Sequence, residues 1–163
     1  MEHSPSPSTL RFSEHARSLF GLRPGGGAAT LEAPPTHKPR FMAGQSRARV
    51  LLVEDDQHLR HALKERLTHD GCDVSEAADG VAARWSLLSC RYDAVIMDLT
   101  LPNTSGVDVM KEVSRNKTLP PILVLTGGEA DERDRARAMG ATFVLKKPSP
   151  YAEIADALDR LLG

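Results

Sequence analysis

The sequence AVIMDLTLP, residues 94–102, sets the architecture that the rest of this chain must fit. Four apolar residues lead into one carboxylate, Asp98, and the turn-forming residues Asn103 and Gly106 follow within a few positions. Such a run is typical of a parallel strand covered by helices on both faces, with Asp98 at the carboxyl end, where ligands bind in these sheets. An aspartate at the end of a single strand can also serve only to turn a loop, so the other strands must decide between these interpretations.

The totals indicate one ordinary domain. A chain of 163 residues with 40% apolar and 26% charged residues is long enough for a hydrophobic core and has the composition of a soluble globular protein. Its apolar runs are too short for a membrane span, so we expect a cytoplasmic protein without membrane contact. Residues 1–48 hold six basic and three acidic residues, whereas residues 49–163 hold fifteen and nineteen, a balance that does not favour nucleic acid.

Residues 1–48 differ from the rest in composition. They hold six of the eleven prolines and the run Gly25-Gly26-Gly27, so they cannot bury enough apolar surface to offset the entropy of ordering, and we predict a disordered basic tail. Two alternatives stay open. One is a short docking helix whose apolar residues have helical spacing: Phe12, Ala16, Leu19 and Phe20. The other is that the biological start is Met42.

From Arg49 onward, apolar runs alternate with helical patterns. The predicted strands are residues 50–53, 72–77, 94–98, 122–125 and 143–145. The predicted helices run to about residue 69, from residue 80, over 106–115, over 131–139 and from residue 151 to the end. Because each parallel crossover needs a helix, residues 49–163 are predicted to form an α/β domain with a five-stranded parallel sheet and helices on both faces.

The spacing of apolar residues predicts which helix faces are buried. In the helix that begins at Gly80, the side chains expected to point toward the core are Val81, Trp85 and Leu88. In the next helix they are Val109, Met110 and Val113. The stretch from Asp131 to Met139 is heavily charged and poor in large apolar residues, so we expect it to pack weakly.

Polar residues stand at the ends of four strands. They are Glu54, Asp55 and Asp56 after the first strand, Asp98 at the end of the third, Thr126 after the fourth and Lys147 after the fifth. Because the carboxyl ends of parallel strands share one edge, these groups should converge, and crowded carboxylates favour Mg²⁺ with oxygen ligands and several waters. Such a site suits phosphoryl transfer, with Asp98 as nucleophile and Lys147, Thr126 and the metal stabilising the transferred group.

The ordered set of motifs resembles the receiver domains of two-component response regulators. The matching segments are LVEDD (52–56), MDLTLP (97–102) with Gly106, Thr126, and Lys147-Pro148, and the intervals of 43, 28 and 21 residues between Asp55, Asp98, Thr126 and Lys147 suit that family. The resemblance covers residues 49–163 and implies the flavodoxin-like (βα)5 fold.

The resemblance also implies roles for single residues. Asp98 would be the phosphoacceptor, Thr126 the switch hydroxyl and Lys147 the phosphate-contacting lysine. For Mg²⁺ or Mn²⁺, the implied ligands are Asp55, Asp98, the backbone carbonyl of Thr100 and, through water, Glu54. Asp56 is expected to cap the following helix, and Lys146 to be a surface charge. The family usually has Tyr or Phe three residues before the lysine, where this chain has Val144; either the adjacent Phe143 substitutes, or the switch lacks its aromatic residue.

The function implied is that of a single-domain, chemotaxis-regulator-like response regulator. It would accept a phosphoryl group from a histidine kinase or histidine phosphotransfer protein, and it would catalyse only its own phosphorylation and dephosphorylation. Its expected output is contact with an unknown protein through residues 131–139, the strand at 143–145 and the last helix. We expect a monomer or weak homodimer, without nucleic acid as partner.

Two other classes of protein must be weighed. A phosphorylation-independent pseudo-receiver, acting only as a protein-binding module, would normally have lost one of the acidic residues or Lys147, and all are present. A phosphatase or phosphotransferase with an aspartyl nucleophile would usually have a second Asp two positions after Asp98, where this chain has Thr100.

Overall fold

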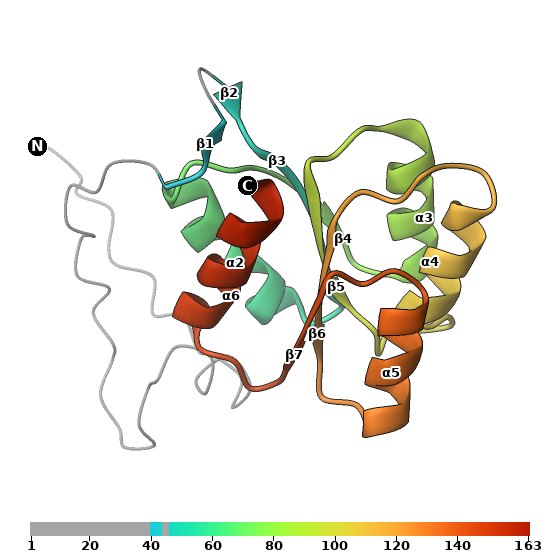
Figure 1. The fold of residues 1–163 in the computed structure, drawn as a ribbon. Coiled ribbons are helices and arrows are strands. Elements are labelled where there is room, and N and C mark those ends of the chain that lie inside the picture. Colours follow the sequence, from blue (N-terminus) through green and yellow to red (C-terminus); the bar gives the residue numbers. More distant parts are fainter. Residues whose placement is uncertain (1–39, 44–45) are drawn as a thin grey trace, which may run out of the picture.

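The computed structural model describes residues 40–43 and 46–163 and contains one parallel sheet between two layers of helices (Figure 1). The sheet has the order β4-β3-β5-β6-β7 and consists of β3 (Arg49–Val53), β4 (Asp73–Ala77), β5 (Ala94–Asp98), β6 (Ile122–Thr126) and β7 (Phe143–Lys146). The helices are α2 (Gln57–His69), α3 (Gly80–Ser89), α4 (Gly106–Ser114), α5 (Ala130–Ala138) and α6 (Tyr151–Leu162). The predicted α/β fold is therefore confirmed.

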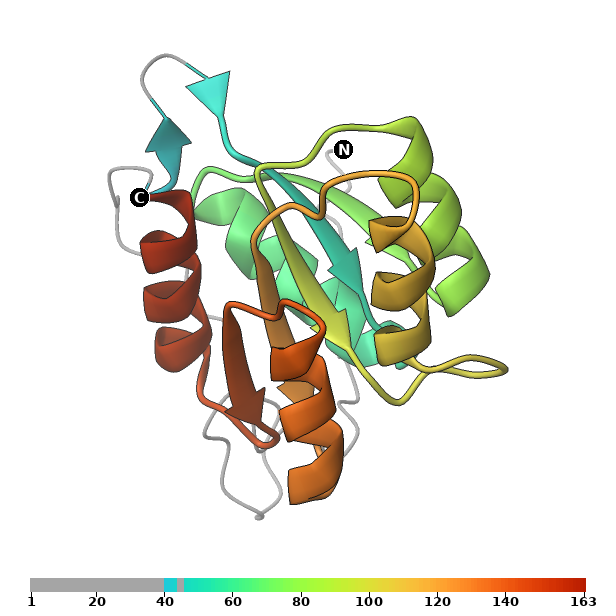
Figure 2. The same ribbon diagram turned by 45° about the vertical axis from the view of Figure 1, so that its right-hand side comes forward.

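The two faces of the sheet carry different helices. Helices α2 and α6 cover one face, and α3, α4 and α5 cover the other, as the two views in Figures 1 and 2 show. Side chains alternate between these layers along each strand: Val50 and Leu52 join the cluster under α2 and α6, whereas Leu51 and Val53 join the other. All five residues of β5, and all five of β6, are buried. Both central strands are thus fixed from both sides.

The direction in which the strands are added to the sheet reverses at one place. The chain passes from β3 to β4 on one side and then returns to β5 on the other side of β3. In parallel sheets, the crevice at such a reversal is where ligands bind. Here that crevice lies between the carboxyl ends of β3 and β5. Glu54 follows the last residue of β3, and Asp98 is the last residue of β5.

The prediction for the buried face of α3 is wrong. Val81, Trp85 and Leu88 are 64%, 69% and 43% exposed. The residues that α3 buries are Gly80, Ala83 and Leu87. A Cβ on Gly80 would lie 1.9 Å from Thr104 Cγ2, so this helix approaches the loop before α4 through its small residues. Small side chains bury little apolar area and are missed when only large residues are counted.

Helices α4 and α5 meet their predictions. α4 buries Val109, Met110 and Val113, as expected. α5 buries only Ala136, which agrees with the weak packing predicted for this charged stretch. In the described part of the chain, no helix is long and apolar enough to span a membrane. The two cysteines, Cys72 and Cys90, are free.

The described structure begins before the predicted domain boundary at residue 49. Phe41 is buried in the cluster under α2 and α6, and its N–H donates to the carbonyl of Asp70 at 2.9 Å. A two-stranded antiparallel sheet of β1 (Met42–Ala43) and β2 (Ser46–Arg47) follows. These residues pack with the domain because the Phe41 ring is buried in its core. The composition of residues 1–48 gives no sign of this contact. The predicted tail up to residue 39, including the docking-helix hypothesis, lies outside the described residues.

Candidate functional site

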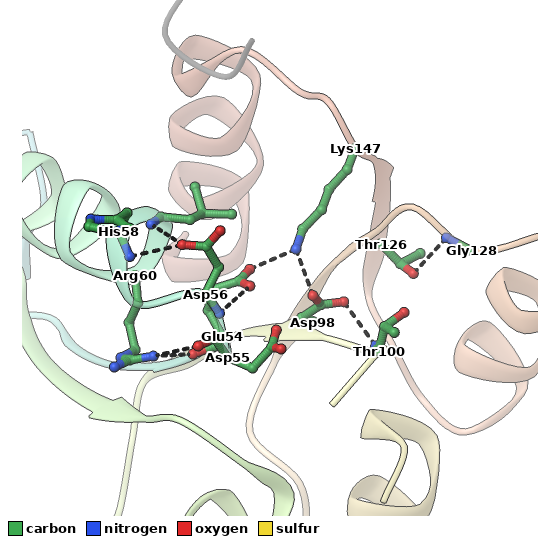
Figure 3. Close-up of polar contacts among 11 residues, drawn as sticks. Glu54, Asp55, Asp56, His58, Arg60, Asp98, Thr100, Thr126, Gly128 and Lys147 are labelled. Atoms are coloured by element: carbon green, nitrogen blue, oxygen red, sulfur yellow. Dashed lines mark hydrogen bonds and ion pairs between the residues drawn. The ribbon is translucent and has the colours of Figure 1, made fainter. Parts of the chain in front are cut away.

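Three buried charged side chains meet where β3, β5 and β7 end. Glu54, Asp98 and Lys147 are 2%, 5% and 8% exposed, respectively. The Lys147 ammonium donates to Glu54 Oε2 at 2.7 Å and to Asp98 Oδ2 at 2.6 Å, and it lies between the two carboxylates in Figure 3. The structure therefore brings together three of the residues that the sequence placed on one edge of the sheet.

Burial and charge act on these groups in opposite directions. Burial raises the pKa of Glu54 to about 7, although Lys147 works against this change. Burial lowers the pKa of Lys147, but Glu54 and Asp98 outweigh it, and the net pKa is raised. Lys147 is thus held as a cation, and Glu54 can take up a proton near neutral pH.

The loop after β5 orients the Asp98 carboxylate. The N–H of Thr100 donates to Asp98 Oδ1 at 2.9 Å. Asn103 has a φ of 67°, a left-handed conformation that Asn tolerates. This turn returns the chain so that the N–H of Gly106 donates to the carbonyl of Leu99 at 2.9 Å. Both oxygens of Asp98 therefore have hydrogen-bond donors, one from the backbone and one from Lys147.

An acidic group suited to a cation lies at the same place. Glu54, Asp55 and Asp98 each offer a carboxylate oxygen, and these atoms lie within 4.8 Å of one another. Asp55 is exposed, which leaves an open side for water or a phosphate oxygen. An all-oxygen donor set with an open side fits a hard divalent cation such as Mg²⁺. For Thr100, the contact found is that of its N–H, so the predicted role of its carbonyl stays a prediction.

Asp56 caps α2, as predicted. Its carboxylate accepts hydrogen bonds from the N–H groups of His58 at 2.8 Å and Leu59 at 3.0 Å. Its own N–H donates to Glu54 Oε1 at 3.2 Å. The cap fixes the start of α2 and with it the turn that carries Glu54 and Asp55.

Arg60, which the sequence did not single out, secures the same turn from α2. Its Nη1 donates to the carbonyl of Glu54 at 2.6 Å and to that of Asp55 at 3.3 Å. Its side chain also lies 3.4 Å from Glu76 at the end of β4. An arginine one helical turn after an acidic loop is a weak sequence signal, because exposed helices are rich in arginine.

Thr126 is fully buried at the end of β6 and faces the start of α5. Its Oγ1 accepts from the N–H of Gly128 at 3.0 Å and donates to Glu132 Oε2 at 3.3 Å. Figure 3 shows the contact with Gly128. Glu132 is the second residue that sequence reasoning missed; the available signal was Gly128, which leaves room beside Thr126.

The two interpretations of Val144 can now be separated. Val144 packs with the cluster under α3, α4 and α5, whereas Phe143 and Leu145 pack with the cluster under α2 and α6. Val124 belongs to the same layer as Val144, and Thr126 follows it by two residues on the same face of β6. Phe143 thus points to the opposite face from Thr126, so the interpretation without an aromatic residue at the switch agrees with the structure.

Comparisons with known proteins agree on one family. The model of the response regulator receiver domain matches residues 50–159. The chain is 38% identical over 115 residues to the transcriptional regulatory protein QseB of Haemophilus influenzae, covering 70% of this chain and 52% of the relative. It is 34% identical to the response regulator MprA of Mycobacterium avium, covering 70% and 50%. The chain thus spans about half the length of these curated relatives.

Solved structures show the same similarity. The non-phosphorylated HemR receiver domain from Leptospira biflexa is 34% identical with a TM-score of 0.67, and the match covers 72% of this chain and 95% of that one. The chemotaxis response regulator CheY4 of Vibrio cholerae is 31% identical with a TM-score of 0.67, covering 72% and 100%. In both cases the similarity extends over nearly the whole of the compared structure.

Proposed function

The chain belongs to the response regulator receiver domain family of two-component systems, and on that premise we propose that it accepts a phosphoryl group on Asp98. The observation that carries the proposal is the buried ion pair between Lys147 and Asp98, 2.6 Å long, beside the acidic turn at Glu54. A buried ammonium touching a buried carboxylate is placed to neutralise the oxygens of a phosphoryl group that this carboxylate accepts.

The proposed chemistry is a transfer between two nucleophiles. An oxygen of Asp98 forms a bond to phosphorus while the bond from phosphorus to the donor's leaving group breaks, and a donor imidazole leaves with the electron pair of that bond. Thr100 N–H and Lys147 hold the two carboxylate oxygens in place. Lys147 can then shift its contact from the carboxylate to a phosphoryl oxygen without leaving the site.

Glu54, Asp55 and Asp98 would hold the divalent cation, Mg²⁺ or Mn²⁺, with the carbonyl of Thr100 as a further ligand. When bound, this cation supplies positive charge that neutralises oxygens of the transferring group. The chain's own contribution is to keep the acidic turn in position. Asp56 does this by capping α2, and Arg60, a residue of α2, does it by donating to the carbonyl of Glu54.

Receiver domains interact with histidine kinases, and we propose a histidine kinase or histidine phosphotransfer protein as the donor. The domain would act on no substrate other than its own phosphoryl group. We propose output by protein contact through α5, β7 and α6, because α5 is the helix with the fewest buried anchors. A monomer or weak homodimer in the cytoplasm fits this role.

Control of DNA by the whole protein is a second candidate. It is favoured by the name of the QseB relative, a transcriptional regulatory protein of which this chain covers 52%. The excess of acidic residues in residues 49–163 argues against DNA contact by the domain itself. Binding of the chain to mixed-sequence duplex DNA at low and high salt tests whether the chain itself contacts DNA.

Phosphorylation by a small donor tests the proposal. The full chain is incubated with acetyl phosphate and Mg²⁺ and its intact mass is measured, with Asp98→Asn as the matched control. We expect wild type to gain one phosphoryl group in a Mg²⁺-dependent manner and Asp98→Asn to gain none. If wild type takes up neither phosphoryl nor beryllofluoride with Mg²⁺, and no cognate kinase phosphorylates it, the pseudo-receiver alternative replaces the proposal.

A further inference from the structure

The hydroxyl of Thr126 is engaged on the side of the site away from Asp98. Its single proton is donated to Glu132 Oε2, and its oxygen accepts the N–H of Gly128. Among the described residues, the hydrogen bonds of Lys147 and of the Asp98 carboxylate go to other partners. The buried hydroxyl thus points its proton at α5.

Gly128 makes this contact possible. A Cβ at position 128 would lie 1.5 Å from Glu132 Oε2 and 3.1 Å from Thr126 Oγ1. The Glu132 carboxylate therefore occupies the space that any other residue at position 128 would fill. A Cβ at the neighbouring Gly127 would meet nothing within 4 Å. The space beside Thr126 is thus a specific feature of position 128.

A hydroxyl has one proton, so two acceptors compete for it. If Asp98 is phosphorylated as proposed above, a phosphoryl oxygen can receive this proton only when the hydroxyl leaves Glu132. We propose that Glu132 is a positioning residue that holds the Thr126 hydroxyl away from Asp98 and so lowers the affinity of the unphosphorylated domain for a phosphoryl group.

The arrangement also connects the site to α5. Glu132 lies in the first turn of a helix whose single buried residue is Ala136. Release of the hydroxyl removes the hydrogen bond between Thr126 at the end of β6 and Glu132 in this helix. The helix has few other buried contacts with the domain. Phosphorylation would therefore loosen or shift α5, because the hydrogen bond between Thr126 and Glu132 is present only in the unphosphorylated state.

Beryllofluoride with Mg²⁺, a phosphoryl mimic, tests the proposal by ¹⁹F NMR titration of the full chain. Glu132→Ala frees the hydroxyl, so we expect it to bind about 3- to 10-fold more tightly than wild type, the range expected for one net hydrogen bond. Glu132→Gln keeps an acceptor oxygen and should change affinity less. The matched control is Asp131→Asn, which removes the other acidic charge from the first turn of α5 and should bind like wild type.

A second route to the same state is Gly128→Ala, which displaces the Glu132 carboxylate without removing it. We expect this variant to bind like Glu132→Ala, and the two changes together to add little. The decisive comparison is made in Thr126→Ala, where Glu132→Ala should have no effect because the hydroxyl is gone.

Each outcome decides a different claim. Equal affinity of wild type and Glu132→Ala overturns the positioning role and leaves the phosphoacceptor proposal intact. An effect of Glu132→Ala that persists in Thr126→Ala also overturns it, since the carboxylate would then act by charge alone. No binding of beryllofluoride by wild type at any concentration counts against the proposed function itself, and the positioning role falls with it.

Discussion

Two successive strand–loop–helix units, β5–α4 and β6–α5, have the same size but different anchoring. Each has a fully buried five-residue strand and a nine-residue helix. α4 buries Gly106, Val109, Met110 and Val113, whereas α5 buries only Ala136. Asp98 belongs to the first unit and Thr126 to the second. The proposed nucleophile thus stands on a fixed unit, and the hydroxyl that would sense the phosphoryl group stands beside a loosely held helix.

The loops of the two units also differ in how tightly they pack. Gly106 packs so closely on the preceding strand that an added Cβ would lie 2.6 Å from the carbonyl oxygen of Asp98. After Thr126, Gly127 is exposed and has no neighbour at that distance. Tight packing keeps the Asp98 carboxylate in one place, and loose packing would let a local change at Thr126 reach the surface. The difference between the units would therefore separate the proposed chemistry from the proposed signalling.

The largest expected difference between the units concerns core truncation. Met110→Ala in α4 should lower the free energy of unfolding by about 2–5 kcal/mol, because it leaves a cavity under a fully buried side chain. Arg135→Ala, a control on the exposed side of α5, should change it by less than about 0.5 kcal/mol. Urea unfolding with a common m-value measures both, and similar losses in the two helices would contradict the comparison.

The buried Glu54 carboxyl beside Asp98 predicts a pH dependence of stability. The pKa of Glu54 is raised from 4.5 to about 7 by burial, so between these values the folded state binds more protons than the unfolded state. Unfolding free energy in the presence of a chelator should therefore fall as pH rises through this window, by roughly 1–3 kcal/mol. Glu54→Gln should flatten the profile, and an unchanged profile in that variant would refute the assignment.

A smaller effect is expected from the two glycines. Gly106→Ala inserts a methyl group against the Asp98 carbonyl and should cost about 1–3 kcal/mol of unfolding free energy. Gly127→Ala has open space and should change stability by no more than about 1 kcal/mol, in either direction. Thermal unfolding of both variants makes the comparison, and a more stable Gly106→Ala would show that the β5–α4 loop is less tightly packed than described.

The fold, and the polar residues at the carboxyl edge of the sheet, were predictable because the sequence signals were local and strong. Buried parallel strands show as unbroken apolar runs, such as residues 94–97 and 122–125, and the polar residue that ends each run must lie at the carboxyl edge. When all the strands run parallel, their carboxyl ends lie at the same edge of the sheet. This places Asp98, Lys147 and Glu54 close together. Their meeting in a buried ion pair follows from topology.

The features that were missed depend on tertiary packing. Trp85 is exposed because α3 buries the face with Gly80, Ala83 and Leu87, and a count of large side chains passes over a face that has only one of them. Phe41 packs in the core beside residues of α2 and α6, which are far from it in the sequence. Glu132 meets Thr126 because Gly128 leaves a gap, and a contact that depends on an absent side chain has no periodic signal.

The most direct test of this account is hydrogen exchange of the full chain with and without beryllofluoride and Mg²⁺, followed peptide by peptide. In the free protein, amides of α5 should exchange at least about tenfold faster than those of α4, a difference of ~1.4 kcal/mol in opening free energy. Binding should change exchange in α5 and at Thr126 and leave α4 as it was. Equal protection of α4 and α5 in the free protein, or a change on binding confined to α4, would contradict the division between a fixed catalytic unit and a movable signalling helix.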